Sequence, residues 1–196
     1  MKLNPKRWSL FLKRITVLNN IVILLPVICF LTAFLKKEKD IYLKCALFFT
    51  LCADYCIIIA SNNLAGVAIF CIAHGFYIMR NTNRIKAIAV FYAVTASLAF
   101  AVYLITKNVL IALSALYACC LMTNAVTAVF MKNKMIIAGT VLFLFCDVCV
   151  LFYNGDAIGI NFPEVVLNRL HILIWLFYTP SQVLLALSLK KRKDRP

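Results

Sequence analysis

Acidic residues are scarce in this chain of 196 residues, which has 7 Asp and Glu side chains against 21 Lys and Arg. Charged residues of both signs make up only 14% of the sequence, whereas 64% of it is hydrophobic. A soluble domain is about 45–50% apolar, and its core cannot bury so large an excess. The scarcity of polar residues therefore excludes a soluble domain, in keeping with a mean hydropathy of +0.94. The length and composition together predict one domain whose solvent is lipid.

The net charge of +14 raises the possibility of a nucleic-acid partner. The basic residues, however, lie between and beyond the apolar runs, as in multi-pass membrane proteins, so we expect no nucleic-acid partner. No small-residue cleavage site follows the basic start "MKLNPKRW", which predicts an uncleaved membrane segment after it. The 9 cysteines lie almost entirely inside apolar runs and lack the spacing of a disulfide framework. They are interpreted as small buried fillers.

The apolar runs lack the strict alternation of a membrane β-barrel, so they are expected to be α-helices. A helix needs about 20 mostly apolar residues to cross the hydrocarbon core. Seven segments meet this condition, which predicts an all-α polytopic transmembrane bundle. The predicted spans are 15–35, 41–60, 64–80, 86–105, 109–130, 135–153 and 168–189.

The chain divides into a basic interfacial tail over 1–14, a transmembrane domain over 15–189 and a basic tail over 190–196. Lys and Arg gather at every second connection between spans, and the positive-inside rule places that side, with the C-terminus, in the cytoplasm. The same rule conflicts with the basic residues of 1–14 if 15–35 crosses the membrane. Either this first span is irregular and shielded by its neighbours, or the N-terminal tail lies along the interface.

Asp54 and Asp147 are carboxylates in the middle of two predicted spans, within "LFFTLCADYCIIIA" and "VLFLFCDVCVLFY". An aspartate at the bilayer centre costs about 2.5–3.5 kcal/mol on insertion scales. At a rise of about 1.5 Å per residue, both lie roughly 18–20 Å from the cytoplasmic edge. His74 and Tyr178 fall within a turn or two of that depth. The same polar layer is expected to include Gln182, Tyr117 and Asn124.

Two carboxylates in a low-dielectric interior can divide acid–base chemistry between them. One keeps its proton and donates it, while the other stays ionised and activates water or stabilises a cation. Glycosidases and aspartic proteases use this division. The alternative interpretation is a structural hydrogen-bonded cluster that holds helices together.

Other membrane chemistries fit the sequence less well. Intramembrane aspartyl proteases need Tyr-Asp and Gly-x-Gly-Asp motifs, whereas this chain reads "ADY" and "CDV". A metal site at Asp54, His74 and Asp147 has no His-x-x-x-His support, and "CDVC" is an isolated Cys-x-x-Cys spacing. A proton-coupled carrier or a receptor stays open, because Pro26 and Pro180 could break helices, although no inverted repeat of hydropathy is visible.

Four blocks follow one another between residues 42 and 189. They are "ALFFTLCADYCIIIASNNLAGVAIFCIAHGFYI", "LYACCLMTNAVTAVF", "AGTVLFLFCDVCVLFY" and "FYTPSQVLLALSL". In this order they resemble the YhhN-type membrane proteins, and the first block maps Asp54, Gly66, His74 and Tyr77 onto that family's pattern. Ala53 and Cys146 stand where the family has Gly and Ser, and Asn19 or Asn20 takes the place of a family lysine. The family usually has eight spans, against seven here.

Characterised members of that family are lysoplasmalogenases, so the resemblance implies cleavage of the vinyl ether bond of a lysoplasmalogen. Vinyl ethers hydrolyse by protonation at carbon and capture of the oxocarbenium ion by water, which calls for an acid and a base. Asp54 and Asp147 are predicted to be these catalytic residues, in either order, and His74, Tyr178 and Gln182 are expected to orient them. Substrate-binding roles are predicted for His74, Tyr77, Tyr117, Asn124, Tyr178 and Gln182.

The same interpretation includes expectations for ligands and location. We expect no cofactor and no metal, a lysophospholipid substrate, and membrane lipid as the surroundings. The expected location is the bacterial cytoplasmic membrane, with the protein crossing it several times. The alternatives are a carrier or receptor for lipid-like molecules, or a family member that has lost activity.

Overall fold

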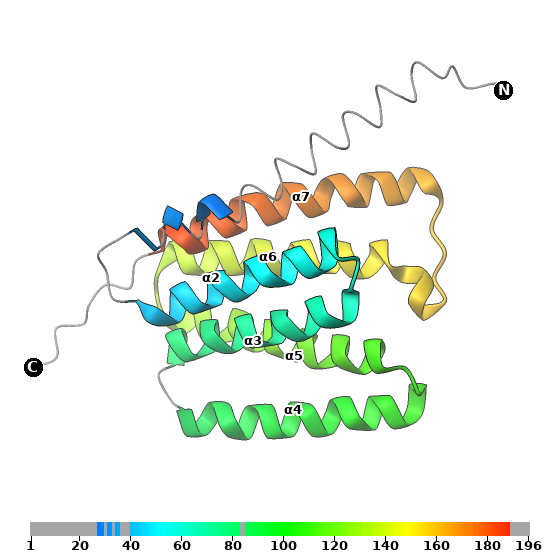
Figure 1. The fold of residues 1–196 in the computed structure, drawn as a ribbon, viewed down its shortest axis with the longest axis horizontal. Helices are drawn as coiled ribbons and strands as arrows, with labels where there is room; N and C mark the ends of the chain where they lie inside the picture. The colour runs from blue at the N-terminus through cyan, green and yellow to red at the C-terminus, as the bar shows by residue number, and fades with distance from the viewer. Residues whose placement is uncertain (1–26, 30, 33, 36–39, 83–84, 189–196) are drawn as a thin grey trace, which may run out of the picture.

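The computed structural model describes residues 27–29, 31–32, 34–35, 40–82 and 85–188, and this part of the chain is helical, without strands (Figure 1). Six helical segments are long and apolar enough to cross a membrane. The predicted all-α transmembrane bundle is therefore confirmed. The helices are α2 (Ile41–Asp54), η1 (Tyr55–Ile59), α3 (Asn63–Thr82), α4 (Ile85–Thr106), α5 (Val109–Phe130), α6 (Lys134–Tyr153), η2 (Gly155–Ile158) and α7 (Glu164–Leu187).

The predicted first span, 15–35, lies mostly outside the described residues. Its described parts, 27–29, 31–32 and 34–35, are helical. The tails predicted at 1–14 and 190–196 lie outside the described part of the chain. Six of the seven predicted spans therefore correspond to long helices in the residues that the structure covers, and the seventh, 15–35, stays a prediction.

Helix α7 is where the sequence-based boundaries differ most from the structure. It begins at Glu164, four residues before the predicted span at 168, and η2 occupies part of the connection that precedes it. Proline fits just before a first helical turn, and an acidic residue in that turn favours the helix dipole. Pro163 and Glu164 supply this start. The helix continues through Pro180, so the break that the carrier interpretation would place there is absent.

Consecutive long helices run antiparallel, so alternate connections lie at opposite ends of the bundle (Figure 1). Helix α7 packs most extensively along α6, α2 packs along α3, and α3 also packs along α5. Helix α4 lies at the edge, mainly against α5. Gly139 lets α7 approach α6 closely, since a Cβ there would lie 2.9 Å from Leu185 Cγ. This arrangement places α2, α3, α5, α6 and α7 around one interior.

An apolar groove of about 280 Å³ runs between α3 and α4. Gly75 creates part of it, because a Cβ at this position would lie 2.5 Å from the Tyr92 hydroxyl. That hydroxyl crosses the gap and donates to the Cys71 carbonyl at 3.0 Å. The groove is lined by Cys71, Ile72, Gly75, Phe76, Met79 and Tyr92.

Candidate functional site

Asp54 and Asp147 each accept a hydrogen bond from a tyrosine on another helix. The Tyr178 hydroxyl of α7 donates to Oδ2 of Asp54, which is the last residue of α2. The Tyr117 hydroxyl of α5 donates to Asp147 Oδ2 of α6 at 2.6 Å. Asp54 is buried and Asp147 is half-buried. Hydrogen bonds to a carboxylate are shorter and stronger than neutral ones, so each tyrosine fixes the direction of its acid.

The two tyrosine–aspartate pairs lie in the same interior of the bundle. A chain of rings joins their tyrosines through the interior. The ring of Tyr117 contacts that of His74 with centroids 5.3 Å apart, His74 stacks on Phe143 at 5.2 Å, and Phe143 contacts Tyr178 at 5.8 Å. Phe143 therefore holds the two tyrosine–aspartate pairs at a fixed separation. The predicted polar layer therefore contains a cluster of aromatic rings that links the tyrosines of its two acids.

His74 hydrogen-bonds neither carboxylate. It is fully buried, and its Nδ1 lies 3.3 Å from Asn124 Nδ2 of α5. The Asn124 side-chain oxygen in turn accepts from Asn81 at 3.0 Å. The expectation that His74 orients an acid is thus replaced by a second polar chain, which joins α3 to α5. Tyr117, predicted only to contact substrate, is the residue that orients Asp147.

Tyr77 and Gln182 are buried on α3 and α7, one turn beyond His74 and Tyr178 respectively. The Tyr77 hydroxyl and both amide atoms of Gln182 have no hydrogen-bond partner among the described residues. The same holds for His74 Nε2 and the Thr50 hydroxyl. Buried polar groups are nearly always paired in folded proteins. These atoms therefore mark a place prepared for a polar ligand or for water.

A π-helical turn, η1, directly follows Asp54 and extends α2 through Ile59. Such turns interrupt the regular ladder of backbone hydrogen bonds and often occur at functional sites. The Asn62 backbone N–H bonds to the Cys56 carbonyl at 2.8 Å, which closes this irregular end. The wider turn begins at the carboxylate, so the backbone around Asp54 departs from the simple geometry that its apolar sequence suggests.

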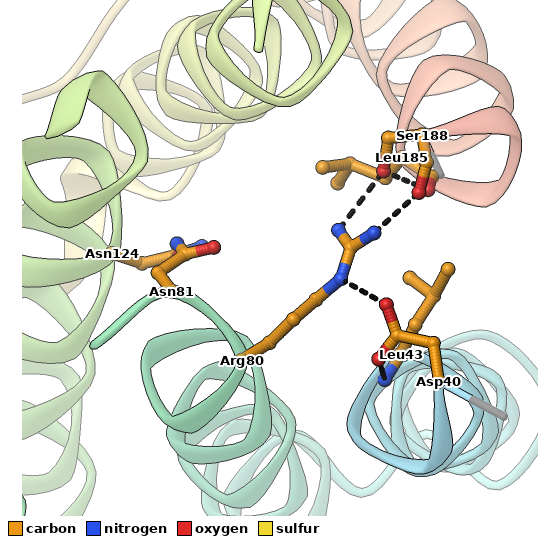
Figure 2. A network of polar contacts seen from close by, with 7 residues as sticks. All are labelled: Asp40, Leu43, Arg80, Asn81, Asn124, Leu185 and Ser188. Atoms are coloured by element: carbon orange, nitrogen blue, oxygen red, sulfur yellow. Dashed lines mark hydrogen bonds and ion pairs between the residues drawn. The ribbon is translucent and has the colours of Figure 1, made fainter. Parts of the chain in front are cut away.

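Arg80 forms a buried polar cluster at one end of the bundle (Figure 2). Its Nε lies 2.8 Å from Asp40 Oδ2, its Nη1 donates to the Ser188 hydroxyl at 2.9 Å, and its Nη2 donates to the Ser188 carbonyl. Asp40 also caps α2 by accepting from the Leu43 N–H at 3.2 Å. The Arg80 cluster, meaning Arg80, Asp40 and Ser188, joins the ends of α2, α3 and α7.

The Arg80 cluster was not predicted from the sequence, because the Lys and Arg residues between spans, Arg80 among them, were used only to assign the cytoplasmic side. A pattern that indicates it was present nonetheless. Asp40 precedes one span and Arg80 ends the next, so antiparallel neighbours bring opposite charges to the same end. Asp54, His74 and Asp147, which were considered as a metal site, do not form a group that could hold an ion. In the described part of the chain, no three His, Cys, Asp or Glu side chains are so grouped.

The fold and this interior define a multi-pass α-helical membrane protein with a pair of intramembrane carboxylates held by tyrosines. The chain belongs to the YhhN family, whose model matches residues 16–189. Neither a curated protein nor a solved structure matches it.

Proposed function

We propose that the protein is a membrane-embedded hydrolase that cleaves the vinyl ether bond of lysoplasmalogens into a fatty aldehyde and a glycerophospho-base. The observation that carries the proposal is the pair Asp54 and Asp147, which lie on different helices and are each held by a tyrosine, with the two tyrosines linked by a chain of ring contacts. Membership of the YhhN family agrees with it. The resemblance drawn from the sequence supplies the substrate class.

The reaction needs one acid, one base and one water molecule. The protonated carboxyl donates its proton to the vinyl carbon farther from the ether oxygen, and the π electrons form the new C–H bond. The adjacent carbon becomes an oxocarbenium centre, which the ionised carboxylate stabilises. This carboxylate takes a proton from water as the water oxygen bonds to that centre. The resulting hemiacetal releases the glycerol oxygen, which regains a proton, and leaves the aldehyde.

The aromatic interior supports this chemistry physically. A low dielectric strengthens the attraction between a carboxylate and a developing cation. Tyr178 and Tyr117 hold the acids in place before the substrate arrives. Tyr77, Gln182 and Asn124 are the proposed substrate-binding residues near the acids, together with His74. The alkyl chain enters from the lipid between helices, and the headgroup stays near one interface.

The proposed setting is the bacterial cytoplasmic membrane, with the C-terminus in the cytoplasm. Its support is the placement of basic residues at one end of the bundle, where Lys132 and Lys134 lie between α5 and α6 and Lys86 lies in the first turn of α4.

The test is aldehyde release from a lysoplasmalogen by the purified protein in detergent. We expect wild type to be active, and Asp54→Asn and Asp147→Asn each to lose about 10²–10⁴-fold in rate while keeping the helical fold, since general acid–base groups contribute that much. Asp156→Asn is the matched control, because this aspartate is exposed on η2. Wild-type release no faster than a protein-free sample would sink the proposal for this substrate.

A further inference from the structure

Three buried residues form a layer between the acids and the Arg80 cluster. Thr50 lies one turn before Asp54 on α2, and Tyr77 and Gln182 come from α3 and α7. We call Thr50, Tyr77 and Gln182 the middle polar layer. Each is no more than 2% exposed.

The middle polar layer has more hydrogen-bonding capacity than the protein uses. The hydroxyls of Thr50 and Tyr77 make no hydrogen bond of normal geometry, with each other or with any other described residue, and neither do the two amide atoms of Gln182. Leaving a buried donor or acceptor unpaired is costly, because the group loses its hydrogen bonds to water without gaining others. Several such groups in one layer require a common partner that both donates and accepts. Water meets this need in a small buried space, where it typically makes two to four hydrogen bonds.

The layer continues toward one end of the bundle. On α3, Tyr77 lies one turn before Arg80, and on α7, Gln182 lies between Tyr178, which donates to Asp54, and Ser188 of the cluster. Asp40, a member of the cluster, has a side chain that is 15% exposed. Polar side chains thus follow one another from Asp54 through the middle polar layer to the surface at the Arg80 end.

The opposite side of Asp54 is closed by apolar packing. Ile57, Phe70 and Ile174 belong to or pack against the hydrophobic core there. Ile57 lies so close over Gly66 that a Cβ on the glycine would be 2.2 Å from its Cγ1. Trp175 extends this side of α7, but its ring nitrogen already donates to His171 at 3.3 Å. Among the described residues, water therefore finds more hydrogen-bond partners on the side of the middle polar layer than on the opposite side of Asp54.

We propose that internal water molecules occupy the middle polar layer and connect Asp54 with the aqueous phase at the Arg80 end of the bundle. The proposal is independent of the substrate. It gives any proton chemistry at Asp54, including the hydrolysis proposed above, a source of water inside the membrane. It also gives Thr50 a role, as a water ligand.

Pulsed X-ray radiolysis of the wild-type protein tests this directly, because hydroxyl radicals form from water and oxidise the side chains beside it. After correction for intrinsic reactivity, we expect Tyr77, which is 2% exposed, to be oxidised severalfold faster than Phe70, which is 8% exposed. The double variant Thr50→Val, Gln182→Met removes water ligands and should bring Tyr77 down to the Phe70 rate. Equal rates for Tyr77 and Phe70 in wild type would overturn the proposal.

A second measurement tests the direction. In a chain whose 9 native cysteines are replaced, Thr50→Cys and Ile57→Cys place a thiol on either side of the acid on one helix. Ag⁺ is small and needs a hydrated path, and thiols that bind it are protected from alkylation after unfolding. We expect Thr50→Cys to be protected severalfold faster than Ile57→Cys; equal or reversed rates contradict the route. Neither experiment uses a substrate, so failure of the proposed hydrolysis would leave both results unaffected.

Discussion

Tyr178 and Tyr117 are the side chains that determine where the two acids point. Each hydroxyl donates to one carboxylate oxygen, and Phe143 lies against the ring of Tyr178 and against His74. A carboxylate without its tyrosine could rotate and would lose part of its stabilisation in a medium that offers few replacements. The tyrosines therefore act as positioning residues in the proposed reaction.

Replacement of either tyrosine by phenylalanine removes the hydroxyl and keeps the ring packing. A hydrogen bond to a charged group contributes about 1.5–3 kcal/mol, so we expect Tyr178→Phe and Tyr117→Phe each to lower kcat by roughly ten- to hundredfold. Aldehyde release gives the rate, and circular dichroism checks the fold. Tyr103→Phe, on the outer side of α4, is the control and should keep full activity. Unchanged kcat in both site variants would contradict the positioning role.

Gly75 is required by the approach of Tyr92 and not by a turn. Alanine there would place a Cβ 2.5 Å from the Tyr92 hydroxyl, which must move and release the Cys71 carbonyl. We expect Gly75→Ala to destabilise the protein by about 1–3 kcal/mol, as overpacking typically does. Thermal unfolding in detergent measures the effect. Adding Tyr92→Phe removes the clashing oxygen, so the double variant should be more stable than Gly75→Ala alone; equal stability would rule out this contact as the cause.

The identity of the polar residues could be predicted, but their pairing could not. Asp54, His74, Asn124 and Tyr178 stand out because polar side chains inside apolar spans are costly and need interior partners. Which partner each one takes depends on the rotation and depth of neighbouring helices, to within a fraction of a turn. That is why His74 was expected beside an acid and lies beside Asn124 instead.

At the scale of helices, the Arg80 cluster joins α2, α3 and α7, which otherwise pack against one another to different extents. Helices α2 and α3 pack extensively, but α2 and α7 meet mainly through side chains, at Asp54 with Tyr178 and in the Arg80 cluster. A fully buried guanidinium is tolerable only while its donors are paired. The cluster therefore holds α7 beside α2 at the end where Asp40 begins the helix.

Separate removal of the two charges tests this role. Breaking one partner of a buried pair costs about 3–5 kcal/mol, so we expect Asp40→Asn, which keeps a capping oxygen, and Arg80→Met each to destabilise strongly. The double variant should cost less than the sum of the two, since no buried charge is left unpaired. Denaturant unfolding measures all three. Lys86→Met is the control, because Lys86 is exposed; strictly additive effects would show that the pair is not coupled.

Helix boundaries were predictable from hydropathy to within a few residues, but helix neighbours were not. The predicted span 109–130 coincides with α5, because Asn108 caps the helix by accepting from Leu110 and Ile111 and so fixes its start. These helices are apolar over most of their surface, so hydropathy does not indicate which helix packs beside which. The packing of α3 on α5 and the peripheral place of α4 are set by side-chain fit in three dimensions.

At the scale of the whole molecule, antiparallel helices fix which connections share a side of the membrane. The connection of α4 to α5 contains Lys107, and that of α5 to α6 contains Lys132. Both lysines have a left-handed backbone, with φ of 52° and 51°, so they are closely matched sites at opposite ends of the same helix. The Arg80 cluster lies at the end of the bundle that carries Lys132, so the proposed water route from the middle polar layer leads to that end.

Cysteine substitutions at Lys107 and Lys132 allow the side of the membrane on which each connection lies to be measured in intact cells. We expect a membrane-impermeant thiol reagent to label Lys107→Cys from outside and Lys132→Cys only after the membrane is opened, because basic connections stay in the cytoplasm. The native cysteines lie within helices at membrane depth and give the background, measured on wild type. Labelling of both variants from the same side would contradict the antiparallel bundle. A reversal, with Lys132→Cys labelled from outside, would keep the bundle but place the Arg80 end, and with it the proposed water route to Asp54, on the outer side of the membrane.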